Sequence, residues 1–136
     1  MYWSRVSISV TRPFFWDVSE PPYRSTKYAP VVQERVVYSQ KYGYCGRLDS
    51  IGFMAEIYAL VDVKTGTIPA TCAAQCAAYL VAQCEMTNTR PDDHGRYCVN
   101  LTPRNFKLIY FPQADLKRDF AVFLNALETW KKENAK

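Results

Sequence analysis

Apolar and polar residues alternate with different periodicities along the chain, and these periodicities predict most of its secondary-structure elements. Valine and isoleucine alternate with polar residues over residues 5–11, which is the period of a half-buried strand. Over residues 51–61 apolar side chains recur at three- and four-residue spacing instead. This spacing predicts a helix that begins near Asp49 or Ser50 and ends at Gly66.

Further elements follow in the second half of the chain. An alanine-rich run over residues 71–86 predicts a second helix, whose small side chains let another backbone approach closely. Residues 97–101 and 106–111 flank a turn-rich connection and predict a β-hairpin. The last element is a third helix, because apolar residues form one continuous stripe at Leu116, Phe120, Phe123, Leu127 and Trp130.

The first 48 residues differ from the rest in composition. They hold four of the eight prolines, ten of the twenty aromatic residues, and seven basic against three acidic residues. Prolines interrupt helices, so this segment is predicted to be an extended arm, in which residues 31–38 form either a short strand or a helical turn. The predicted fold is therefore α+β: a small body of three helices and a β-hairpin over residues 49–136, preceded by the arm over residues 1–48.

Overall composition excludes several classes of protein. The 136 residues are 49% apolar and 22% charged, which is ordinary for a globular domain and unlike a disordered or fibrous chain. No run of apolar residues is long enough to predict a transmembrane helix. The net charge of +4 is mild for a dedicated nucleic-acid-binding protein, so no specific nucleic-acid partner is predicted.

The aromatic residues of the arm point to protein partners. Each ring carries roughly 150–250 Å² that must find a surface, and an extended arm cannot shelter so many rings by itself. Interface hot spots favour Tyr, Trp and Arg. The residues predicted to bind partners are Trp3, Phe14, Phe15, Trp16, Tyr23 and Tyr28. This pattern predicts a non-enzymatic accessory or structural subunit of a large multiprotein assembly, with other protein subunits as partners and membrane contact only through them.

The first 16 residues suggest where such an assembly is located. They contain Arg5, Arg12 and three serines but no acidic residue, and in this they resemble a mitochondrial targeting segment. The resemblance implies a mitochondrial location. The modest net charge favours a respiratory-chain-type complex over a ribosomal one.

Five cysteines and one histidine offer a candidate metal site. Cys72 and Cys76, followed by His94 and Cys98, have spacings that resemble the ligand pairs of Cys/Cys/His/Cys zinc fingers. The resemblance implies a zinc-binding module. The alternative is that these cysteines are small apolar residues of a tightly packed core, and the sequence leaves both open.

A second partial resemblance concerns residues 48–69. The segments Leu48-Asp-Ser-Ile51, Ala59-Leu60 and Gly66-Thr-Ile-Pro69 resemble the second helix of acyl carrier proteins and the loop after it. The resemblance implies that Ser50 would carry a phosphopantetheine arm, whereas a simple helix N-cap explains the same residue. No pattern typical of nucleotide-binding loops or hydrolases is present, so neither catalytic residues nor a cofactor is predicted.

Overall fold

The residues described by the computed structural model are 28–101, 103 and 106–135, and they form a five-stranded sheet with two long helices. The elements in chain order are β1 (Tyr28–Ser39), β2 (Tyr44–Met54), β3 (Ile57–Thr65), α1 (Cys72–Thr87), the short 3-10 helix η1 (Pro91–Asp93), β4 (Gly95–Leu101), β5 (Phe106–Phe111), the 3-10 helix η2 (Gln113–Asp115) and α2 (Leu116–Glu133).

The strands lie in the sheet in the order in which they follow along the chain. All neighbouring pairs are antiparallel except β3 and β4, which are parallel. Parallel neighbours need a long crossover, and α1 provides it. In this connection, α1 crosses one face of the sheet on the way from β3 to β4.

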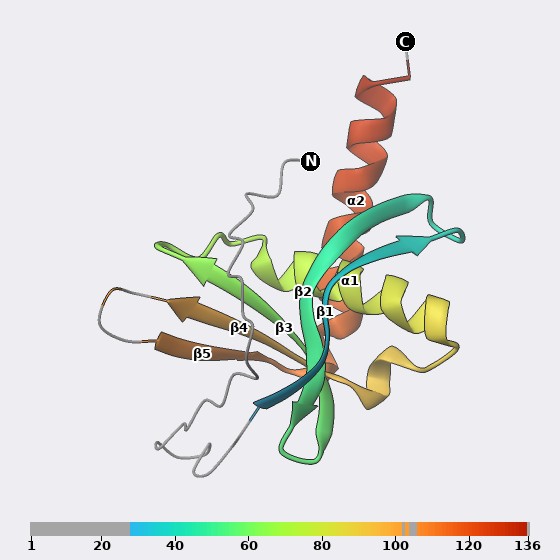
Figure 1. The fold of residues 1–136 in the computed structure, drawn as a ribbon. Coiled ribbons are helices and arrows are strands. Elements are labelled where there is room, and N and C mark those ends of the chain that lie inside the picture. The colour runs from blue at the N-terminus through green and yellow to red at the C-terminus, as the bar shows by residue number, and fades with distance from the viewer. Residues whose placement is uncertain (1–27, 102, 104–105, 136) are drawn as a thin grey trace.

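The two helices lie on the same side of the sheet (Figure 1). α1 is buried almost all round, because it packs on the sheet with one face and on α2 with another. Its small alanines and cysteines permit this close packing on both sides. α2 is amphipathic and covers α1, and it also contacts the tip of the β1–β2 hairpin, where Lys131 Nζ donates to the Tyr42 carbonyl over 3.1 Å.

Strands β2 and β3 run together for only part of their length. Their pairing extends from Met54 and Ile57 to Ser50 and Val61, after which β2 continues alongside β1 and β3 continues alongside β4. The sheet therefore forks, and in Figure 1 the curved β1–β2 hairpin bends away from β3. The first residues beyond the last pair are Asp49 and Asp62, so the fork opens between two carboxylates.

The predicted fold class is wrong, because the chain forms a five-stranded mixed sheet with two long helices and not three helices with a hairpin. The helix predicted from Asp49 to Gly66 is instead the β2–β3 hairpin. Two buried apolar strands joined by a short turn happen to place residues at helical spacing. Ala55 begins that turn with a φ of 57°, in the left-handed region that two-residue hairpin turns require.

Several other predicted elements are confirmed. The helix over residues 71–86 is α1, the C-terminal helix is α2, and the hairpin at 97–111 is β4 with β5. Residues 31–38, left open between strand and helical turn, lie in β1. The predicted boundary between residues 48 and 49 falls inside β2, and the predicted strand over residues 5–11 lies outside the described residues. Neither long helix has the length and apolarity that a bilayer span would need.

Candidate functional site

Two acidic side chains meet where the sheet forks. Asp62 is 2% exposed, and its side chain lies on the face of β3 that α1 covers, with its Oδ2 atom 3.8 Å from the sulfur of Cys72. Asp49 of β2 is half-buried, and its Oδ2 atom accepts a hydrogen bond of 2.9 Å from the Val63 backbone N–H. That N–H would meet a β2 carbonyl in an unforked sheet. The Asp49 carboxylate thus replaces the missing strand neighbour and is fixed beside Asp62.

The same segment of β3 supplies two further groups. In a strand, the N–H and C=O of one residue point to the same edge, so the Val63 carbonyl faces the fork as its N–H does. Alternate side chains share a face, which places Lys64 beside Asp62, and the Lys64 Nζ atom lies 3.0 Å from Asp62 Oδ2. The sequence Asp62-Val63-Lys64 therefore presents a carboxylate, a carbonyl oxygen and an ammonium group at one point.

The electrostatics of this point are unbalanced. Burial raises the pKa of Asp62 to about 8, and hydrogen bonding with Asp49 and the charge of Asp49 act in the same direction. Lys64 opposes this shift but does not cancel it. Burial by itself would lower the pKa of Lys64, but the charge and hydrogen bond of Asp62 outweigh it, so that pKa is raised. Two carboxylates therefore compete for one lysine, and additional positive charge would be stabilised here.

Helix α1 covers the fork and holds it in shape. Its first residue, Cys72, contacts Asp62. One turn further on, Gln75 Nε2 donates to the Tyr79 hydroxyl over 3.1 Å, and both side chains are buried. The Tyr79 ring lies so close to β2 that a Cβ atom on Gly46 would be 2.6 Å from its Cε1 atom. Only glycine at position 46 permits this contact, so the sequence of β2 is adapted to the aromatic ring above it.

The structure brings together only part of the predicted zinc ligand set. Cys72 and Cys98 lie with Asp62, and their ligand atoms are all within 4.8 Å of one another, which is the only such group of three in the described part of the chain. Cys76 is buried next to Cys72. His94 is directed elsewhere, with its Nδ1 atom 2.7 Å from the Arg90 carbonyl and 3.7 Å from the sulfur of Cys84.

These thiols differ in acidity. Hydrogen bonds from Cys76 and Cys98 lower the pKa of the Cys72 thiol, while burial opposes the shift. The same hydrogen bonds, followed by burial, raise the pKa of Cys76 and Cys98. All the cysteines are free. Cys72 is thus the member of the cluster that most readily becomes a thiolate.

The remaining predicted site residues have ordinary surroundings or lie outside the described residues. Ser50 is inside β2, where its hydroxyl shares a hydrogen bond with the Tyr28 hydroxyl, so the helix start required by the carrier resemblance is absent. Tyr28 is 1% exposed and packs against Met54 and its neighbours in the sheet. The other predicted partner-binding residues lie outside the described residues; they are Trp3, Phe14, Phe15, Trp16 and Tyr23.

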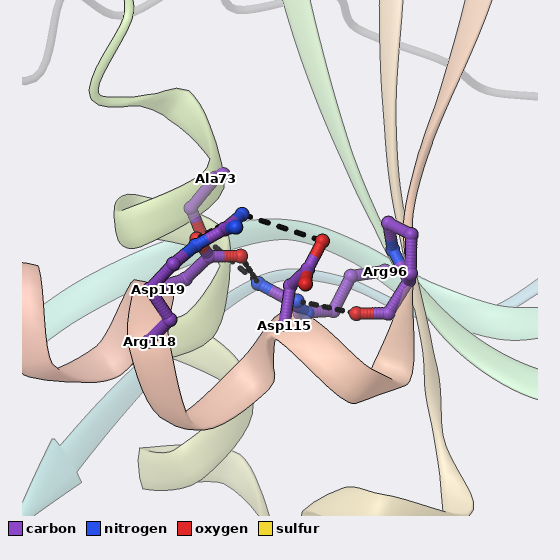
Figure 2. Close-up of polar contacts among 6 residues, drawn as sticks. Ala73, Arg96, Asp115, Arg118 and Asp119 are labelled. Atoms are coloured by element: carbon purple, nitrogen blue, oxygen red, sulfur yellow. Dashed lines mark hydrogen bonds and ion pairs between the residues drawn. The ribbon is translucent and has the colours of Figure 1, made fainter.

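A second polar cluster, drawn in Figure 2, fixes both helices to the sheet. The side chain of Arg96 on β4 is 1% exposed, and its Nη1 atom donates to Asp119 Oδ2 over 3.0 Å and to the Ala73 carbonyl over 3.1 Å. Its Nη2 atom donates to the Pro112 carbonyl over 3.1 Å. Both terminal nitrogens of the guanidinium thus have acceptors, and α1, α2 and β4 are joined at one point.

Sequence reasoning missed Asp49, Asp62 and Lys64 as site residues. It assigned them to one helix, where positions 62 and 64 point in different directions. A strand assignment would have placed an acid and a lysine on one face, two positions apart, directly after a run of buried apolar residues. That pattern was the available signal.

Comparisons with known proteins provide little guidance. No family model matches the chain, and no curated protein matches it. Among solved structures, the chain is similar to one described as the crystal structure of SSO0001, with 17% identity and a TM-score of 0.38. The match covers 71% of this chain and 50% of that one, so this chain spans about half of the matched protein. We draw nothing about function from this likeness.

Proposed function

We propose that this protein is a divalent-cation-dependent hydrolase that cleaves phosphodiester bonds of nucleic acid. One observation carries the proposal: Asp49, Asp62 and Lys64 converge where β2 and β3 separate. The proposal departs from the sequence-based expectation of a non-enzymatic accessory subunit. That expectation rests on the ten aromatic residues of residues 1–48, six of which lie outside the described residues, and it stays a prediction.

The donor set fits a hard divalent cation. The carboxylates of Asp49 and Asp62 and the carbonyl of Val63 would hold the ion, and all three are oxygen ligands of the kind that Mg²⁺ and Mn²⁺ prefer. The raised pKa of Asp62 supports this fit. The two carboxylates repel each other, and a bound cation would neutralise the negative charge that Lys64 leaves uncompensated. When bound, such an ion polarises a phosphoryl oxygen and lowers the pKa of a bound water.

Lys64 has a separate role in the proposed reaction. Its ammonium group lies 3.0 Å from Asp62, so it reaches a phosphate placed at the carboxylates. There it would donate a hydrogen bond to a phosphoryl oxygen and offset the negative charge that develops during attack. Water adds to phosphorus, the bond to the ester oxygen breaks, and the proton of the water ends on the leaving oxygen. The products are a phosphomonoester and a hydroxyl group.

A nucleic-acid substrate is supported by the charge of the hairpin beside the fork. Between Tyr28 and Leu48 the hairpin carries Arg35, Lys41 and Arg47 against one acidic residue, Glu34. Arg47 is exposed and lies two positions from Asp49. Phosphate contacts by Arg and Lys position a polynucleotide without reading its sequence. The fork would thus receive a strand whose neighbouring phosphates contact the hairpin.

A cleavage assay with matched variants tests the proposal. The full chain is incubated with supercoiled plasmid or with a labelled single-stranded oligonucleotide, in Mg²⁺, in Mn²⁺ or in chelator. Cleavage is expected only with the cation. Asp62→Asn and Lys64→Ala should each lower the rate by about 100-fold or more, the scale seen when a group that stabilises transition-state charge is removed.

Controls repeat the same chemical changes at exposed positions, as Asp92→Asn and Lys117→Ala, and should leave the rate unchanged. Calorimetric titration with Mn²⁺ separates the two roles, because binding should be lost in Asp62→Asn and kept in Lys64→Ala. Cation-independent cleavage, or full activity of Asp62→Asn, would contradict the proposal.

A further inference from the structure

A group of buried thiols lies beside Asp62 and has no role in the proposed hydrolysis. Cys72 and Cys76 come from the first turns of α1, and Cys98 comes from β4. The ligand atoms of Asp62, Cys72 and Cys98 lie within 4.8 Å of one another, and all of these residues are buried. Two elements, α1 and β4, therefore deliver soft sulfur ligands to a carboxylate of β3 that also faces the fork.

We propose that Asp62, Cys72 and Cys98, with Cys76 as the adjacent donor, form a site for a thiophilic divalent cation such as Zn²⁺, and that this ion inhibits hydrolysis by occupying Asp62. The inhibitory part rests on the proposed function, whereas the binding part does not. Mg²⁺ does not compete for this side of Asp62, because sulfur ligands select Zn²⁺ and oxygen ligands select Mg²⁺.

The geometry fits a zinc ion after a small adjustment. For three atoms no more than 4.8 Å apart, some point lies within about 2.8 Å of all of them. Zinc bonds to sulfur and oxygen measure about 2.0–2.3 Å, so each donor has to move by roughly half an ångström or a little more. Rotation about the side-chain bonds of Cys72 and Asp62 supplies movements of that size. The backbone of β3, β4 and α1 can stay in place.

The charges also fit. Binding converts two thiols to thiolates and releases their protons to solvent. Two thiolates and one carboxylate then face the two positive charges of the ion and the ammonium of Lys64, which lies 3.0 Å from Asp62. The ion, its three anionic ligands Asp62, Cys72 and Cys98, and Lys64 are together neutral.

Inhibition follows from the shared ligand. A Zn²⁺ ion bound to Asp62 would neutralise its carboxylate and repel a second cation from the fork. Asp49 and the Val63 carbonyl would remain as an incomplete set for Mg²⁺. Low concentrations of Zn²⁺ should therefore stop cleavage in the presence of excess Mg²⁺, and a strong zinc chelator should restore it.

The test measures metal–thiolate bonds directly and needs no enzyme activity. The reduced full chain is titrated with Cd²⁺ and with Co²⁺ and followed by absorbance. The expected result is an ultraviolet charge-transfer band that saturates at one ion per chain, and with Co²⁺ the intense visible bands of tetrahedral coordination. In Cys72→Ser or Cys98→Ser the Cd²⁺ band should fall by about a third to a half, because each change removes one of two or three thiolates.

Two serine variants serve as controls: Cys45→Ser at an exposed thiol and Cys84→Ser at a buried one near His94. Both should keep the full band. Absence of the band in the wild-type chain overturns the inference even if the variants fail to fold, and so does a band that persists unchanged in Cys72→Ser and Cys98→Ser. A band without any cleavage activity would support the metal site and contradict only the proposed hydrolysis.

Discussion

Two buried carboxylates in this fold have opposite surroundings. Asp119 on α2 faces the guanidinium of Arg96, which also donates to the carbonyls of Ala73 and Pro112. Asp62 on β3 faces a second carboxylate, that of Asp49, and shares one lysine with it. The first cluster is balanced in charge and hydrogen bonding. The second is crowded with like charge.

The difference separates a structural role from a functional one. A buried ion pair whose donors and acceptors all match holds elements together and has nothing left to offer a ligand. A buried acid with a raised pKa beside another acid is costly to the fold on its own, and such groups cluster at functional sites. Burial of charge by itself is thus a poor indicator of a site, whereas unbalanced charge is a better one.

Breaking the balanced cluster should have the largest effect on stability. Arg96→Ala leaves Asp119 buried with only the exposed Arg118 guanidinium near it, and takes the donors from two carbonyls. The expected loss is about 3–5 kcal/mol of unfolding free energy, as for other buried pairs that lose one partner. Urea denaturation measures it. A loss below about 1 kcal/mol would mean that the cluster is not a structural anchor.

Removing one carboxylate from the crowded cluster should increase the stability of the protein at high pH, whereas breaking the balanced cluster decreases it. In chelator the folded chain keeps a proton on Asp62 up to a pKa of about 8, whereas the unfolded chain releases it near 3.8. Wild-type stability should therefore fall as pH rises through this window, because the folded state binds the extra proton. Asp49, Lys64 and Cys72 face Asp62 in the wild type and face its replacement in the variant.

Asp62→Asn should remove this part of the slope and make the metal-free protein more stable than wild type at the upper end of the window. Denaturation curves of both proteins across the window give the comparison. If the variant is less stable at every pH, burial and the Asp49 carboxylate do not destabilise the charged form of Asp62. Adding Mg²⁺ should stabilise the wild type and leave the variant unchanged.

A substitution at the contact between β2 and α1 should have a smaller effect on stability. In Gly46→Ala, the new methyl group would lie 2.6 Å from Tyr79 Cε1, so the ring or the strand has to shift. Overpacking of this kind costs about 1–3 kcal/mol. The thermal midpoint should fall, whereas Cys45→Ala at the neighbouring exposed position should leave it unchanged. An unchanged midpoint for Gly46→Ala would show that the ring moves freely.

The smallest effect is expected at the rim of the balanced cluster. The side chain of Arg118 is 70% exposed and lies 3.3 Å from Asp115 and 3.5 Å from Asp119. Exposed ion pairs contribute roughly 0–1 kcal/mol, so Arg118→Ala should change stability by no more than that. The contrast with Arg96→Ala, measured by the same denaturation curves, shows how much burial contributes at one carboxylate.

Helices with long uninterrupted patterns were predictable from the sequence. The stripe from Leu116 to Trp130 became α2, and the alanine-rich run became α1, because one periodicity extends over the whole element in each case. The hairpin of β4 and β5 was also predictable from its turn-rich connection. These elements depend on local chemistry that a single sequence displays.

The β2–β3 hairpin was not predictable by the same reasoning. Its residues at 51, 54, 57, 58 and 61 match helical spacing only because two strands meet at the Ala55–Glu56 turn. Once these residues were assigned to a helix, Asp62 and Lys64 could not be recognised as neighbours. The site depends on the pairing of two strands and on the helix above them, and neither is a local property of the chain.

The two-residue turn at Ala55 and Glu56 has a further consequence for how this protein can change over evolutionary time. Because strand side chains alternate between faces, inserting or deleting one residue between Asp49 and Asp62 would carry the acid and the lysine to the opposite side of the sheet. The length of this small loop is therefore constrained by chemistry that takes place elsewhere. Drift in length should be confined to connections such as the one between β4 and β5, which no part of the proposed site spans.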